Sequence, residues 1–131
     1  MTSTTSEQST SVAAGTLAWW EIPVVDLGAA KTFYTTVFGW TYQDFGDGYS
    51  MISSGDQTIG GLTTMGAEHA ADGCRLYIQV DDLEATLATA KAAGGSVFAE
   101  RTHIGDGMGY WAMFADDQGR HIGVVTDNDA A

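Results

Sequence analysis

The chain has 131 residues, and 17 acidic against 5 basic side chains give it a formal charge of −12 at pH 7. Its 44% hydrophobic and 11% aromatic content suits a compact domain with a buried core and excludes a wholly disordered chain. Because such an acidic surface repels phosphates and anionic headgroups, we expect neither nucleic acid nor a membrane surface as a partner. The sequence shows no long apolar run and no secretory leader, so a cytoplasmic protein is expected.

The two ends of the chain differ from its middle. Residues 1–15 are mostly Ser, Thr and small residues, which predicts a flexible leader, and residues 128–131 predict a short tail. A single domain is expected over residues 16–127. Its one cysteine, Cys74, excludes an intrachain disulfide, and we expect its thiol to be a small buried apolar group.

The first part of the domain, about residues 17–66, predicts a strand followed by a helix and three more strands. Alternation over residues 17–24 indicates the strand, with Trp19 and Glu21 on one face and Trp20 on the other. This alternation makes the two faces of the strand chemically different.

The helix that follows has clear start and stop signals. Asp26 is typical of an N-cap, and the helical spacing of apolar residues ends at Gly39. The aromatic residues of the helix and the next strand are expected in the core: Phe33, Tyr34, Phe38 and Trp40. Glycine-punctuated alternation predicts strands at residues 40–45, 49–53 and 58–63.

The same order returns over about residues 74–126. It predicts a strand, a helix over residues 83–93 capped by Asp81 or Asp82, and strands at residues 96–102, 109–115 and 121–126. Val24, Asp26 and Gly39 of the first part coincide, at one constant offset, with Val80, Asp82 and Gly95. The sequence therefore predicts an α+β fold of two tandem βαβββ modules, whose curved antiparallel sheets form a cup.

Several segments carry a resemblance to a known family. They are residues 21–27 (EIPVVDL), 37–40 (VFGW), 60–62 (GGL), 92–95 (AAGG) and 114–123 (FADDQGRHIG). In this order the chain resembles the vicinal oxygen chelate superfamily, also called the glyoxalase, bleomycin-resistance and extradiol-dioxygenase superfamily, and within it a bacterial single-domain branch. The resemblance implies paired modules, commonly a homodimer, with a small-molecule ligand in the cup.

The resemblance also implies where a metal would be held. Metal-dependent members use a His on the first strand of each module and a Glu on the last strand of one or both. Those positions fall here on Trp19, Arg75 and Gly123, which offer no side-chain lone pair to a metal. We therefore expect no usual metal site and no cofactor. A rearranged site is the alternative, drawn from His69, His103, His121, Glu21, Glu68 and Glu100.

The candidate ligand-binding residues follow from strand alternation. If the usual ligand positions still face inward, Trp19 and Glu21 meet Arg75, Tyr77 and Gln79, and Trp111 and His121 are further lining candidates. Three roles stay open for Glu21: a structural tie to Arg75, a ligand anchor, or a catalytic general base.

Two main hypotheses of function follow. The first is a protein that binds a hydrophobic or aromatic molecule, with cations favoured by the negative charge, for sequestration or resistance. The alternative is a lyase, isomerase or dioxygenase of the same fold, either metal-free with Glu21 as acid or base, or with a rearranged metal site. A third hypothesis is a dimer whose cup is filled by its own side chains.

Overall fold

The computed structural model describes residues 13–66, 73–105 and 107–128. Most of the expected leader and tail, Asp106 and the segment with Glu68 and His69 lie outside the described residues. The described chain contains eight strands and two helices and divides into two compact units. Of the described residues, those within Trp19–Arg75 form the first unit, and residues 13–18 and those from Leu76 onward form the second.

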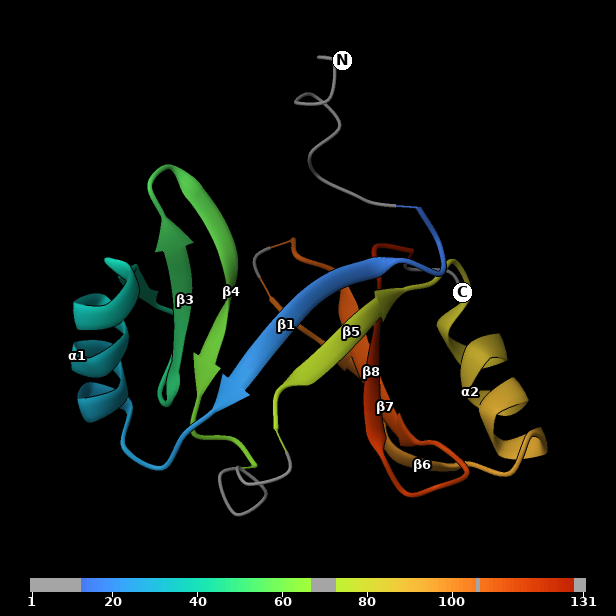
Figure 1. Cartoon of the computed structure of the whole chain (residues 1–131). Coiled ribbons are helices and arrows are strands. Elements are labelled where there is room, and N and C mark those ends of the chain that lie inside the picture. The colour runs from blue at the N-terminus through green and yellow to red at the C-terminus, as the bar shows by residue number, and fades with distance from the viewer. Residues whose placement is uncertain (1–12, 67–72, 106, 129–131) are drawn as a thin grey trace. The chain divides into compact units, whose positions relative to one another are not determined.

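The first unit has the predicted βαβββ order (Figure 1). Its elements are β1 (Leu17–Pro23), α1 (Leu27–Phe38), β2 (Thr41–Asp44), β3 (Tyr49–Ser54) and β4 (Gln57–Thr63), and the strands lie in the order β2-β3-β4-β1. Pairing is antiparallel except between β1 and β4, which are parallel. The parallel pair, which we did not predict, arises because α1 returns the chain so that β2 and β4 both run in the direction of β1.

Helix α1 begins and ends at the predicted residues. The Asp26 carboxylate accepts a hydrogen bond from the backbone N–H of Ala29 at 2.9 Å. Gly39 ends the helix with a φ of 74°, in the left-handed region that a residue with a side chain adopts at a cost.

The predicted burial of the α1 aromatics is wrong for two of them. Phe33 is 59% exposed and Phe38 is 58% exposed, and α1 buries no residue completely. The rings contact one another instead. The ring centroids of Phe38 and Trp40 are 4.8 Å apart, and those of Trp40 and Trp20 are 6.0 Å apart. The reason is geometric, since the aromatic side chains spread around more of α1 than the side that contacts its own sheet.

The second unit repeats this order. It contains β5 (Arg75–Gln79), which begins at the last residue of the first unit, then α2 (Leu83–Ala92), β6 (Ser96–His103), β7 (Tyr110–Ala115) and β8 (His121–Thr126). The strands lie in the order β5-β8-β7-β6, and β5 and β8 are parallel. Asp82 is the N-cap, with a φ of −125° against −121° for Asp26, so the two modules start their helices in the same way.

The core of the second unit lies between α2 and one face of its sheet. It contains Leu83, Leu87, Ala112 and Val124. Burying each leucine contributes about 1.5–3 kcal/mol, so α2 is held by apolar packing that α1 lacks. Because side chains alternate along β8, Gly123 lies on the opposite face from Val124.

Two further observations concern single features of the chain. Cys74 is exposed, contrary to the prediction, because it lies between Gly73 and the first residue of β5, before the sheet begins. No helix in the described part of the chain is long and apolar enough to cross a membrane.

Candidate functional site

A chain of polar contacts links four side chains of the first unit on the face of β1 that carries Trp19. The indole Nε1–H of Trp19 donates to the Tyr49 hydroxyl at 2.8 Å, and that hydroxyl donates to Oε2 of Glu21 at 2.8 Å. The Nε–H of Arg75 donates to Oε1 of Glu21 at 3.3 Å. We call Trp19, Glu21, Tyr49 and Arg75 the Trp19 network.

The Trp19 network shelters an ion pair. The side chains of Glu21 and Arg75 are 11% and 17% exposed, and Arg75 also donates through Nη2 to the carbonyl of Met65 at 2.7 Å. A sheltered carboxylate is stable when it has charged and hydrogen-bonding partners, and Glu21 has both. No buried side-chain nitrogen or oxygen in the described residues lacks a hydrogen-bond partner. This geometry favours the structural tie among the three roles considered for Glu21.

Sequence reasoning missed Tyr49, which completes the network. The alternation around Tyr49 predicts a strand but says nothing about which strand lies opposite, so it indicates no role for this residue. The available signal was the pair of adjacent glycines in β4, Gly60 and Gly61, which leave room for large side chains on a neighbouring strand.

The other predicted lining residues lie in the second unit. Tyr77 and Trp111 meet edge to face, with ring centroids 6.5 Å apart and an interplanar angle of 83°. His121 lies against Phe98 instead, with ring centroids 4.5 Å apart. Gln79 is held by its backbone, which accepts from Gly15 at 2.7 Å and donates to Thr16 at 2.9 Å.

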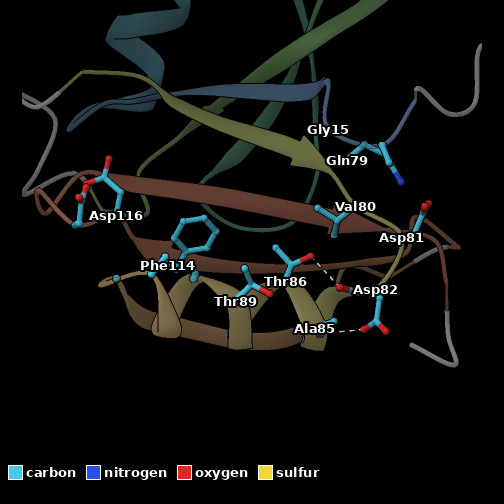
Figure 2. A pocket seen from close by; sticks show the side chains of 15 residues that line it. Gly15, Gln79, Val80, Asp81, Asp82, Ala85, Thr86, Thr89, Phe114 and Asp116 are labelled. Carbon is cyan, nitrogen blue, oxygen red and sulfur yellow. Dashed lines mark hydrogen bonds between the residues drawn. The ribbon is translucent and has the colours of Figure 1, made fainter.

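The second unit also contains a groove of about 700 Å³ along α2, which the sequence analysis did not predict (Figure 2). Its lining residues are Ala14, Gly15, Gln79, Val80, Asp81, Asp82, Ala85, Thr86, Thr89, Ala90, Ala93, Gly95, Phe114, Asp116 and Asp117. The residues of α2 that line the groove are small and recur at helical spacing, so they leave it open on that side. Figure 2 shows Thr86, Thr89 and Phe114 projecting into the space.

Acidic groups lie at both ends of this groove, whose lining contains no Lys or Arg. The Asp82 carboxylate caps α2 through the N–H of Ala85 at 3.0 Å. At the other end, hydrogen bonds from the backbone N–H groups of Arg120 and Gln118 lower the pKa of Asp116. Asp116 therefore stays charged to a lower pH than an ordinary aspartate.

The residues at the expected metal positions do not fit a metal ion. Trp19 has no lone pair to offer and donates its N–H to Tyr49, and Arg75 is a cation bound to Glu21. Gly123 has no side chain. Within the described ranges no three His, Cys, Asp or Glu residues gather closely enough to hold a metal, and Glu68 and His69 lie outside those ranges.

Comparison with known proteins agrees with the arrangement of the elements. The sequence of residues 16–124 matches the family model of the Glyoxalase/Bleomycin resistance protein/Dioxygenase superfamily. A Mycobacterium tuberculosis protein named "Putative glyoxylase CFP32" is 34% identical over 115 residues, which are 85% of this chain and 44% of that protein. The "Anthracycline biosynthesis protein DnrV" of Streptomyces peucetius is 29% identical over 137 residues, covering 88% of this chain and 48% of that protein.

A solved structure shows the same fold. It is a glyoxalase/bleomycin resistance protein/dioxygenase superfamily member from Vibrio splendidus 12B01, with a TM-score of 0.59 and 15% identity. It is matched over 85% of this chain and 99% of that one. This chain spans less than half the length of the mycobacterial and Streptomyces relatives. With two βαβββ units and a family match over residues 16–124, the chain belongs to the glyoxalase/bleomycin resistance protein/dioxygenase superfamily.

Proposed function

We propose that this protein binds a planar aromatic small molecule, preferably a cationic one, at the Trp19 network and without a metal ion there. The observation that carries the proposal is that an indole, Trp19, stands where the family resemblance places a metal-binding His, and that Tyr49 holds its N–H at 2.8 Å. A ring fixed in this way is pre-organised for stacking, because it loses little rotational freedom when a ligand arrives.

Charge supports a cationic ligand. The ring face of tryptophan attracts cations, and the net charge of −12 adds a long-range attraction for them. The names of relatives support a small-molecule ligand, since the family is named in part for bleomycin resistance and one relative for anthracycline biosynthesis. Sequestration of such a compound, or its transfer to another protein, is the activity that we propose.

A titration with the anthracycline daunorubicin tests the proposal, because it combines a planar aromatic system with an amino sugar. Calorimetry or quenching of drug fluorescence should give saturable binding. Trp19→Leu should weaken it at least tenfold, or about 1.4 kcal/mol. Trp20→Leu is the matched control: it removes an indole from the opposite face of β1 and should leave affinity nearly unchanged.

Two outcomes would contradict this proposal. One is equal affinity in the Trp19→Leu and Trp20→Leu proteins. The other is loss of binding in Thr89→Trp, which fills the groove along α2, at unchanged affinity in Trp19→Leu. The second result would move the ligand to that groove.

Metal content is the second test of the same proposal. Protein purified without a metal-affinity tag, then incubated with zinc, iron, manganese or nickel and desalted, should contain far less than one ion per chain by elemental analysis. Daunorubicin affinity should not change after chelation. Stoichiometric metal would instead favour the rearranged site and make Lewis-acid chemistry the first hypothesis.

An enzymatic role rests on one specific contact. The Tyr49 hydroxyl lies 2.8 Å from the Glu21 carboxylate, and such a pair is able to move a proton to or from a bound molecule. We keep a metal-free lyase or isomerase as the second candidate function.

A further inference from the structure

Two adjacent glycines of β4 accommodate large aromatic side chains on opposite faces of the sheet. A Cβ atom added to Gly60 would lie 2.7 Å from the indole of Trp20, on the face of the sheet where Trp20 contacts Trp40. A Cβ atom added to Gly61 would collide with the hydroxyl and ring of Tyr49. Neither glycine has a positive φ, so close approach, and not backbone freedom, explains the absence of a side chain.

The second unit has a glycine at the register position that matches Gly61, although the ring over it comes from the paired strand and not from the next one. Gly61 pairs with Glu21 across the parallel strands β1 and β4, and Gly123 pairs with Tyr77 across the parallel strands β5 and β8. A Cβ atom added to Gly123 would collide with the ring of Tyr77. In both units an aromatic side chain therefore lies over a glycine of the parallel strand pair.

These two glycines coincide with the place of a family feature. The resemblance puts a metal-binding Glu of the closing strand at Gly123, and the shared register puts its first-unit equivalent at Gly61. The volume through which such a carboxylate would project is filled by Tyr49 in one unit and by Tyr77 in the other.

We infer that Gly61 and Gly123 are positioning residues: each lacks a side chain so that a tyrosine can occupy the place of a closing-strand metal ligand. In the first unit, Gly61 lets the Tyr49 hydroxyl lie between the Trp19 indole and the Glu21 carboxylate. In the second unit, Gly123 lets the Tyr77 ring meet Trp111 edge to face. We call this placement of Tyr49 and Tyr77 over the two glycines the seating. Its effect on ligand affinity rests on the proposed function, whereas the placement itself does not.

The indole N–H signals of ¹⁵N-labelled tryptophan test the seating without any ligand. The protein has four tryptophans, and substitution assigns one signal to each. Gly61→Ala should move the Trp19 signal upfield and speed its exchange with solvent, because its acceptor on Tyr49 is displaced. The matched control Gly60→Ala should move the Trp20 signal and leave the Trp19 signal in place. Gly123→Ala should move the Trp111 signal.

A Trp19 signal that does not respond to Gly61→Ala, or that responds equally to Gly60→Ala, overturns the inference for the first unit. If Gly61→Ala does not fold, the substitution is made in the Tyr49→Ala background, where the colliding group is gone. The double variant should then unfold at the same urea concentration as Tyr49→Ala alone. Further destabilisation would show that Gly61 is required for another reason and would overturn the inference.

A binding measurement connects the seating to function. Gly61→Ala should weaken daunorubicin binding at least tenfold, and Gly60→Ala should change it less than threefold. If the wild-type protein does not bind the drug while the indole signals respond as expected, the proposed function fails and the positioning role stands. If the drug binds equally to both variants, the positioning role has no part in recognition.

Discussion

Among single residues, Glu21 connects β1 to two side chains that lie far from it in the sequence. Its two carboxylate oxygens accept from different partners, Tyr49 and Arg75, which come from β3 and from the start of β5. Removing one member of a sheltered ion pair leaves the other charge without compensation. The network is thus sensitive to the charge of Glu21 as well as to its shape.

Glu21→Gln keeps the shape and removes the charge. It should lower the free energy of unfolding by about 1–3 kcal/mol in urea denaturation, because Arg75 is left sheltered with a weaker acceptor. Glu84→Gln, which breaks the more exposed pair with Arg101, is the control and should cost less. Daunorubicin affinity should change little in Glu21→Gln. Loss of turnover of any identified substrate at retained affinity would instead make Glu21 a catalytic residue.

At the scale of elements, α1 and α2 are attached to their sheets by different forces. Leu83 and Leu87 of α2 are buried, whereas α1 relies on exposed ring contacts and on Lys31, which pairs with Asp44 of β2 at 2.8 Å. Ser50 of β3 also donates to Asp44 at 2.7 Å. These contacts make Asp44 a link between α1 and two strands.

The link should be lost in acid. The hydrogen bond from Lys31, followed by that from Ser50, lowers the pKa of Asp44 below its ordinary value of 3.8. A carboxylate with a lowered pKa stabilises the fold fully above its unfolded pKa, and this contribution disappears as the pH falls through the folded value. Carboxyl NMR titration of Lys31→Met should show the Asp44 pKa rising toward 3.8. The control Lys91→Met, in α2, should leave it unchanged, and an equal rise in both proteins would contradict this assignment.

At the scale of the whole molecule, the net charge of −12 acts over distances that no single contact reaches. Salt screens such attraction, because the Debye length is about 10 Å at 0.1 M and about 3 Å at 1 M ionic strength. Added salt should therefore weaken the affinity for a cationic ligand more than the affinity for a neutral ligand with the same ring system.

Affinity for daunorubicin should fall several-fold between 0.05 and 0.5 M NaCl, as measured by calorimetry. The neutral aglycone, which lacks the amino sugar, is the control and should bind with nearly the same affinity at both salt concentrations. Equal salt dependence of the two compounds would show that the overall charge has no part in recognition.

The order of elements, the repeat and the N-cap Asp26 could be predicted from the sequence, which left the second N-cap open between Asp81 and Asp82. Asp26, Gly39 and Asp82 act on their own backbone within a few residues, and strand alternation is equally local. The meeting of Trp19, Glu21 and Arg75 followed from these patterns together with the family resemblance, and their role in binding stays a prediction.

The remaining features depend on which elements lie side by side in the folded chain. Phe33, Phe38 and Cys74 are exposed, His121 lies against Phe98, and Tyr49 lies over Gly61. No periodic pattern in the sequence indicates these exposures and contacts, because they depend on how elements distant in the sequence pack together. The type of a residue indicates which contacts it is able to make. Which of these contacts forms depends on the strand that pairs with its own.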